Sequence, residues 1–315
     1  LSDSVWSNRP LSFPVSPDKR AITTGAVSDP SAMPTVAFMG SHPLGERCLD
    51  ELTSHEAFDV ELVVTYGPNE DTWWDGCLYD RAKQLGHRVV TRSSERLVLQ
   101  HDVDYLVSVY YPNILDAELL DHPNVAPLNL HQAELPRYRG SNVFSHAIMN
   151  ARDDDHWRYG TTLHVMAPEV DAGDIVARRF VPIEETDTAR MLYERVTDAS
   201  VELFREQLTT LRDGDVHRVA TPQSAYNGER YFYAKSSLDG EKAIPADRLA
   251  AADEATQLAV YDKIRALDFP PFRPAYTELG GNRVYLTATE YGDLFGSAPV
   301  PSLGVETETI AVSQD

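Results

Sequence analysis

The sequence predicts an α/β fold, an open and mostly parallel twisted sheet, followed by a small α+β C-terminal domain. Short apolar runs alternate with longer amphipathic runs from residue 34 onward, as in βαβ units with right-handed crossovers. Hydrophobic residues make up 42% of the 315 residues, which is enough for a packed core. After residue 223 this alternation stops and an aromatic, turn-rich segment begins. The length agrees with two domains.

The apolar runs predict the strands in chain order. Five parallel strands are expected at residues 35–39, 59–65, 88–91, 104–110 and 125–129. Residues 161–166 and 175–180 follow as a pair of edge or antiparallel strands.

Amphipathic runs between and after these strands predict the helices. The first is entered through the turn at 40–45 and runs through about residue 54. The others cover residues 73–85 and 188–211, with Asp187 and Thr188 at the N-terminal cap of the last one. The catalytic domain is expected at residues 34–220 and a small C-terminal domain at 221–315. The latter should hold a helix at 246–267, a hairpin at 275–290 around Gly280-Gly281, and a peripheral tail at 297–315. Residues 1–33 are expected as a loosely ordered extension, with Met33 as the alternative natural start.

The charge balance is strongly acidic. There are 49 Asp and Glu against 28 Lys and Arg, a net charge of −21, and only 5 of the basic residues are Lys. This argues against a general binder of nucleic acid or of anionic membranes, because phosphate contacts need clustered cations. The composition resembles that of salt-loving proteins; an ordinary acidic cytosolic protein is the alternative.

The location expected from the sequence is the cytoplasm. Two cysteines, Cys48 and Cys77, form no CxxC and are expected as buried structural thiols in a reducing compartment. No apolar run reaches the roughly 18 residues of a spanning helix, and the first 32 residues do not resemble a signal peptide.

Several frequent motifs are missing from the sequence. No GxGxxG follows the first strand, and there is no phosphate-binding Walker loop or GxSxG elbow. No HExxH or Cys/His cluster has metal-ligand spacing, so no metal is expected.

The informative polar residues begin at the C-terminal end of the fifth predicted strand. Asn129 and His131 are two apart and so share one side of the strand, at the end where open α/β sheets bind ligands. Asp171 lies in an acidic, glycine-containing turn between the next two strands. An amide, an imidazole and a carboxylate suit acyl transfer, because the first two can stabilise an oxyanion and the third can orient the imidazole. Each residue alone also has an ordinary structural interpretation.

Four motifs together carry a resemblance to a known family. They are Asn129-x-His131, Leu135-Pro136-x-Tyr138-Arg139-Gly140, Tyr159-Gly160-x-Thr162-x-His164 and Val170-Asp171-Ala172-Gly173-Asp174-Ile175. Their order and spacing resemble the folate-dependent formyltransferases, which transfer the formyl group of 10-formyltetrahydrofolate to an amine. The resemblance covers about residues 34–291 and implies a Rossmann-like formyltransferase fold.

The resemblance also implies roles for individual residues. Asn129 would hold the formyl oxygen, His131 would stabilise it and assist proton transfer, and Asp171 would orient His131. The residues implied at the folate site are Tyr111, Ile114, Leu115, Arg139, Gly140 and Asp174. Pro112 stands where the family commonly has glycine, so the resemblance is weaker in that loop.

The acceptor amine is expected on a nucleotide-linked amino sugar. Residues 221–315 carry 8 Lys and Arg against 14 Asp and Glu, a poor surface for tRNA. In the run 230–235, Tyr231, Tyr233 and Lys235 could bind a base or sugar and a diphosphate, or the run could pack between the domains. The alternatives are methionyl-tRNA formylation, another amine acceptor, a formyl-folate hydrolase and an inactive folate- or sugar-nucleotide-binding regulator. By analogy with the family, a homodimer is possible.

Overall fold

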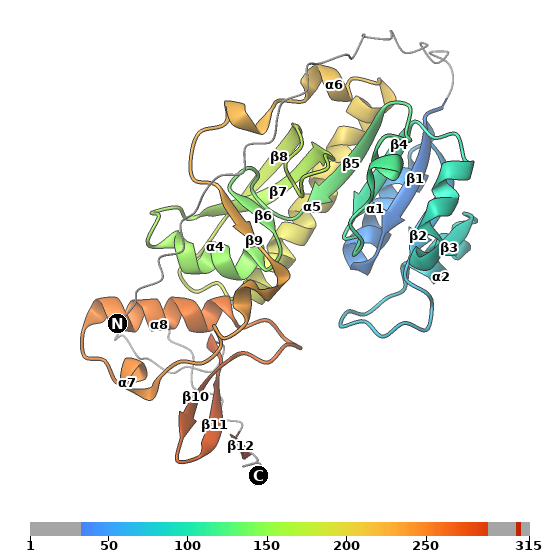
Figure 1. Cartoon of the computed structure of the whole chain (residues 1–315). Helices are drawn as coiled ribbons and strands as arrows, with labels where there is room; N and C mark the ends of the chain where they lie inside the picture. Colours follow the sequence, from blue (N-terminus) through green and yellow to red (C-terminus); the bar gives the residue numbers. More distant parts are fainter. Residues whose placement is uncertain (1–32, 289–306, 310–315) are drawn as a thin grey trace, which may run out of the picture. The chain divides into compact units, whose positions relative to one another are not determined.

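The computed structural model describes residues 33–288 and 307–309 (Figure 1). Its central feature is a seven-stranded sheet with strand order β3-β2-β1-β4-β5-β7-β8. The strands are β1 Thr35–Gly40, β2 Asp59–Thr65, β3 Val89–Thr91, β4 Tyr105–Val109, β5 Ala126–His131, β7 Arg158–Val165 and β8 Ile175–Pro182. The first five are parallel, and β7 and β8 are antiparallel. The predicted mostly parallel α/β sheet is confirmed.

One face of the sheet is covered by three helices of the described chain. These are α1 His42–Ser54, α2 Leu78–Gln84 and α5 Ala189–Arg212. Their apolar side chains share a core cluster with alternate residues of the strands, including Phe38, Val107 and Leu128. The period-2 alternation of the strands therefore sends these residues to one layer and their neighbours to the other.

The opposite face has a lighter cover and bears the polar residues of interest. Strand residues such as Met39 and Leu106 pack there with η1 Arg92–Gln100 and α3 Ala117–Leu120. In β5 the burial alternates, so that Leu128 and Leu130 face the helices while Asn129 and His131 face this second side.

The loop after β5 contains two elements that the sequence did not predict. The short strand β6 Tyr138–Gly140 is followed by α4 Val143–Ala151, which packs against α5 and α8. Strand β6 pairs in parallel with β9 Tyr231–Tyr233, a segment almost one hundred residues later. This pairing joins the beginning of the C-terminal segment to the loop after β5.

The C-terminal segment combines helices with an antiparallel sheet. Its three-stranded sheet has the order β10-β11-β12, with bounds β10 Ala275–Leu279, β11 Asn282–Leu286 and β12 Thr307–Thr309. Gly280 and Gly281, both with positive φ (57° and 79°), form the predicted tight turn of the hairpin. The shorter elements before it are α6 Val216–Val219, η2 Gln223–Ala225, η3 Lys235–Leu238, α7 Ala246–Leu249 and α8 Glu254–Ala266.

Two of the predicted helices differ from the observed ones. The helix expected from Trp73 begins only at Leu78, because Gly76 has a φ of 95° and the two tryptophans before it pack around His42 in a loop. The helix expected at 246–267 is two helices, since the Asp253 side chain caps a new start by accepting from the Thr256 N–H. Cys48 is buried as predicted, but Cys77 is only half-buried.

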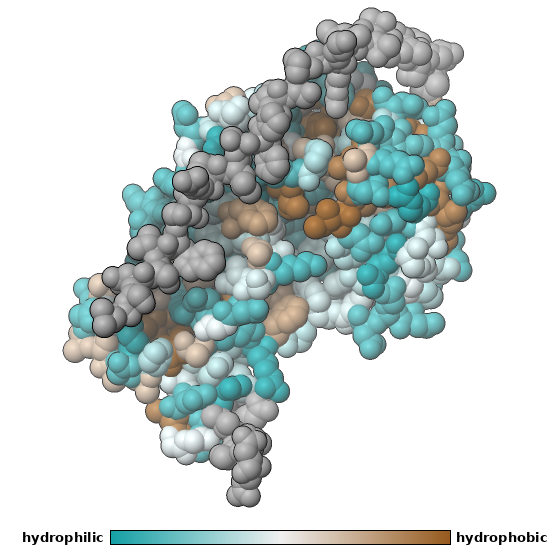
Figure 2. Space-filling model, viewed as in Figure 1, coloured by the Kyte–Doolittle hydropathy of each residue, from teal (hydrophilic) through white to brown (hydrophobic). Residues whose placement is uncertain are grey.

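The visible surface of the protein is largely hydrophilic. Figure 2 shows hydrophilic residues over most of one face and hydrophobic side chains gathered near its middle. None of the described helices is both long and apolar enough to cross a bilayer. The predictions for residues 1–32, and for the tail apart from β12, fall outside the described residues.

Candidate active site

The candidate site lies at the carboxyl end of β5, on the face away from α1 and α5. Asn129 and His131 project there, and Asp171 reaches them from the turn between β7 and β8. The Nε2 atom of His131 lies 3.7 Å from Oδ2 of Asp171. The Asn129 Nδ2 atom lies 3.5 Å from Oδ1 of the same carboxylate. The structure thus brings together the three residues to which the sequence assigned catalysis.

Asp171 is held in an unusual backbone conformation. Its φ of 50° lies in the left-handed region, which a non-glycine residue rarely adopts. The Gly140 N–H donates to its Oδ2 at 3.0 Å, and only 11% of the side chain is exposed. The carboxylate is therefore fixed from the side-chain end by a backbone donor.

The electrostatic environment favours the ionised carboxylate. Burial raises the pKa of Asp171, but attraction to His131, a hydrogen bond and attraction to His164, and the Gly140 N–H outweigh it. The net result is a pKa well below the usual range for Asp. The site consequently contains a permanent anion beside two imidazoles.

His131 is oriented by two acceptors. Its Nε2 atom lies 3.1 Å from the carbonyl oxygen of Tyr138 in addition to facing Asp171. A carbonyl and a carboxylate only accept hydrogen bonds, so the assigned tautomer carries its hydrogen on Nε2. In the neutral ring, Nδ1 then holds the lone pair that can take up a proton.

A second histidine belongs to this site. His164 of β7 is 1% exposed, and its Nδ1 is 3.0 Å from the Val165 carbonyl, to which it donates. In the neutral ring Nε2 then accepts from the Asn129 amide at 3.2 Å. Nε2 also lies 3.6 Å from Asp171, to which it donates when the ring is protonated. The sequence placed His164 in the third motif but assigned it no role, although its two-residue spacing from Thr162 was visible.

Gly140 allows the loop after β5 to close against β9. It has a φ of 93°, and a Cβ at this position would clash with the carbonyl oxygen of Tyr233. The close approach is what lets its N–H point at Asp171. Its neighbour Arg139 pairs with Glu169 at 2.8 Å and lies over the ring of Phe232.

The residues predicted for the folate site follow β4, the neighbour of β5. Tyr111 donates its hydroxyl to Glu95 at 2.7 Å, and Asn113 bonds the same carboxylate at 2.8 Å. Leu115 packs on the core beneath, whereas Ile114 is 79% exposed. Because β4 and β5 are parallel and paired, this loop and His131 lie at the same edge of the sheet.

Other predicted residues are less closely connected with the trio. The Asp174 side chain is exposed at the start of β8. The Tyr231 and Tyr233 hydroxyls are bonded to Asp154 and Asn150, and the Tyr233 ring stacks on His146 at 3.6 Å. Lys235 is exposed, and its backbone carbonyl accepts from Asn142.

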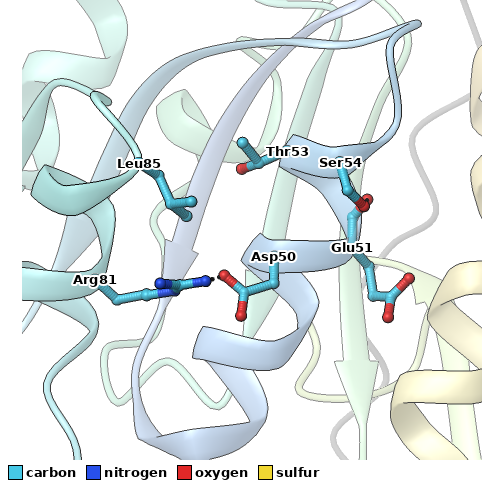
Figure 3. Close-up of a pocket in the computed structure, with 6 residues that line it drawn as sticks. All are labelled: Asp50, Glu51, Thr53, Ser54, Arg81 and Leu85. Carbon is cyan, nitrogen blue, oxygen red and sulfur yellow. Dashed lines mark hydrogen bonds and ion pairs between the residues drawn. The ribbon is translucent and has the colours of Figure 1, made fainter.

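A surface hollow lies elsewhere, between α1 and α2 (Figure 3). It measures about 310 Å³ and is lined by Asp50, Glu51, Thr53, Ser54, Arg81 and Leu85. The polar groups in it include the Arg81–Asp50 ion pair at 2.7 Å, and none of the predicted site residues lines it. Among the residues that the structure describes, there is no group of three or more His, Cys, Asp and Glu arranged to hold a metal ion.

Comparison with known proteins points to one family. Residues 77–208 match the family described as formyl transferase. A methionyl-tRNA formyltransferase of Macrococcus caseolyticus is 29% identical over 276 residues, which cover 84% of this chain and 82% of that protein.

Solved structures share the fold at lower identity. A 4-N formyltransferase from Francisella tularensis has a TM-score of 0.64 at 19% identity, covering 82% of this chain and 98% of its own. The N-formyltransferase from Helicobacter canadensis was solved with folinic acid and dTDP-3-aminofucose. It has a TM-score of 0.60 at 17% identity, covering 86% of this chain and 97% of its own. Residues 77–208 of this chain are therefore a formyl transferase domain, built on the fold that these N-formyltransferases share.

Proposed function

We propose that this protein transfers the formyl group of 10-formyltetrahydrofolate to the free amine of a nucleotide-linked amino sugar. The observation that carries the proposal is the convergence of Asn129, His131 and Asp171 at the end of β5, inside a formyl transferase domain. The folate supplies the activated formyl group.

The chain's residues fit a flat folate ring beside this trio. Ile114, with 79% of its surface exposed next to Leu115, offers an apolar contact for one face of the ring. Glu95 anchors the same loop through Tyr111 and Asn113. Arg139 and Gly140 border the site from β6, and Asp174 lies at the end of the turn that carries Asp171.

Asn129 and His131 are suited to stabilise an oxygen that becomes negative as an amine attacks the formyl carbon. The Asn129 amide has two N–H groups, of which one is directed at His164. The second faces the Asp171 carboxylate at 3.5 Å, a long contact that it can exchange for the developing oxyanion. Once protonated, His131 adds a positive charge near it, balanced by the buried Asp171 carboxylate.

The amine must also lose a proton during attack. The lone pair on Nδ1 of His131 can accept it, directly or through water. The imidazolium can then return the proton to the folate nitrogen as the bond between that nitrogen and the formyl carbon breaks and tetrahydrofolate leaves. Asp171 acts on this step by fixing the ring through Nε2 and by stabilising the imidazolium that forms. Its low pKa keeps it from competing for the proton.

The acidic C-terminal segment favours a small acceptor over tRNA. Residues 221–315 contain 8 Lys and Arg against 14 Asp and Glu, so phosphate contacts along a tRNA would meet net negative charge. The fold relative from Helicobacter canadensis was solved with a dTDP-linked amino sugar. Methionyl-tRNA is the second candidate, because that is the substrate named for the curated relative from Macrococcus caseolyticus.

Tetrahydrofolate release measured with two acceptor panels tests the proposal. We expect turnover with dTDP- or UDP-linked amino sugars and none with methionyl-tRNA. Turnover on methionyl-tRNA alone would refute the sugar assignment, and folate binding without turnover on any amine would favour a regulator. Asn129→Ala and His131→Ala should each lower kcat at least about 100-fold, as loss of an oxyanion donor or an acid–base group does. Unchanged turnover would refute the site.

A further inference from the structure

Gln223 is a buried side chain that contacts the turn carrying Asp171. Its Nε2 atom donates to the carbonyl oxygen of Asp171 at 2.8 Å and to that of Gly173 at 2.9 Å. A primary amide has two N–H groups, so both are used on this one turn. Only 8% of the Gln223 surface is exposed.

The turn needs such support because it is strained and tightly packed. Asp171 has a φ of 50°, a left-handed conformation that is unfavourable for a residue other than glycine. A Cβ on Gly173 would clash with the Val165 carbonyl oxygen, so the turn lies directly against β7. The backbone conformation of Asp171 decides where its carboxylate points.

Gln223 is itself fixed by the chain around it. Thr221 forms a two-way backbone bridge with Ile175, the first residue of β8, with both N···O distances at 2.9 Å. The carbonyl oxygen of Gln223 accepts from Arg230 at 2.8 Å. These bonds fix the backbone on both sides of Gln223, so its side-chain amide is held against the turn at residues 171–173.

We propose that Gln223 is a positioning residue for the reaction, which holds the 171–173 backbone so that the Asp171 carboxylate faces His131 and His164. This inference takes the reaction, formyl transfer, from the proposed function; the contacts of Gln223 do not depend on it. Gln223 touches two backbone carbonyls, whereas Gly140 holds the carboxylate end of the same residue. The two contacts clamp Asp171 from opposite ends.

Three variants test the proposal. Gln223→Met keeps the length of the side chain and removes both donors, and Gln223→Glu keeps the shape but presents an acceptor to two carbonyls. Gln257→Met is the matched control, because Gln257 also donates to a backbone carbonyl, that of Ala251 at 3.0 Å, in the C-terminal segment.

We expect Gln223→Met to lower kcat about 10- to 100-fold, with KM for both substrates changed less than about threefold, since small misplacement of a catalytic group has effects of this size. Gln257→Met should stay within about twofold of the parent protein, because its amide donates within the C-terminal segment and not to the 171–173 turn. At neutral pH, Gln223→Glu should lower kcat at least as much as Gln223→Met does. It should regain part of its rate, relative to the parent at the same pH, as acid protonates the new carboxyl and restores one donor.

A double variant separates positioning from a general structural effect. If Gln223 acts only through Asp171, then Asp171→Asn with Gln223→Met should turn over as slowly as Asp171→Asn alone. If the double variant instead lowers kcat by the product of the two single-variant effects, the proposal is overturned. Should Gln223→Met fail to fold, the acid recovery of Gln223→Glu decides the question, and its absence counts against the proposal.

Hydrogen exchange of the peptide covering residues 167–174 tests the inference without any acceptor. Exchange should be faster in Gln223→Met than in the parent and in Gln257→Met, while β1 and β4 keep their protection. Unchanged exchange would overturn the clamp. A parent protein that is inactive on every amine, with this faster exchange intact, would refute the proposed function and leave the clamp standing.

Discussion

Asp171 has the most unusual environment of the residues at the candidate site. It combines a left-handed backbone, a nearly buried carboxylate and contacts to two imidazoles and one backbone N–H. Burial alone would neutralise such a group. Its surroundings instead hold the pKa well below the usual range, so ionisation of Asp171 is coupled to folding.

The low pKa predicts a pH-dependent contribution to stability. Folding favours the ionised form, so the stabilisation is complete above the ordinary carboxyl pKa of about 4 and is lost as the pH falls through the lower folded-state pKa. Asp171→Asn should therefore lower the free energy of unfolding more at pH 7 than at pH 3, as measured by urea denaturation. Asp174→Asn, in the same turn but exposed, should have little effect at either pH. An Asp171→Asn effect that grows toward acid would contradict the assignment.

From the sequence, site residues could be predicted only where their spacing along a strand places them on the same face. Asn129 and His131 are two residues apart on a recognisable strand end, so their common face followed from strand geometry. Gln223 donates to carbonyls about fifty residues away, and backbone carbonyls leave no residue-specific signal in the sequence. The hydrogen bond from the Gly140 N–H to Asp171 could not be predicted for the same reason, because a backbone N–H also leaves no residue-specific signal.

At the scale of elements, the pairing of β6 with β9 determines the shape of the site loop. It places Tyr138↔Tyr231 and Gly140↔Tyr233 opposite each other. The paired segment supplies the carbonyl that orients His131 and the N–H that holds Asp171. A short two-stranded contact thus connects the C-terminal segment to both ionisable groups.

This connection predicts unequal effects of two glycine substitutions. Gly140 and Gly86 both have positive φ, 93° and 85°, but only Gly140 is pressed against another backbone. Gly86→Ala should cost about 1–2 kcal/mol of unfolding free energy, the usual penalty of a left-handed conformation. Gly140→Ala should cost more in urea denaturation and also lower turnover, because the clash with Tyr233 separates β6 from β9. Equal losses in the two variants would show that the close approach is unimportant.

The sequence predicted strands better than helices because the strands are buried apolar runs. All seven sheet strands match predicted runs within a few residues. The element η1 was missed since its residues are mostly polar and only Val98 is buried. The segment at Trp73 and Trp74 looked helical from its apolar content, yet those rings pack around His42, a tertiary contact without a helical period.

At the scale of the whole molecule, the acidic excess exceeds what ion pairing can neutralise. Arginine supplies most of the ion pairs of the described residues, for example Arg195–Asp187 and Arg205–Glu51. With 49 acidic residues against 28 basic ones, many carboxylates have no cation to pair with. Their mutual repulsion opposes the compact state.

Screening should therefore stabilise the protein. The Debye length falls from about 10 Å at 0.1 M salt to about 3 Å at 1 M, which weakens repulsion between surface carboxylates. We expect a higher Tm in 1 M KCl than in 0.1 M KCl, by about 2–4 °C if screening recovers 1–2 kcal/mol. NaCl should act alike, because screening depends on ionic strength. A Tm that stays constant or falls with salt would contradict this interpretation.

The pairing of β6 with β9 also sets an order for assembly during synthesis. All seven strands of the main sheet have been made once residue 182 is added, whereas β9 is complete only at Tyr233. At translation rates of roughly 5–20 residues per second, the intervening fifty or so residues take about 3–10 s. A nascent chain can thus build its sheet before it can close the loop around His131. A segment made after the whole sheet thus completes the candidate site, so an interrupted chain of about 220 residues would carry the sheet without the contacts that β9 gives to this site.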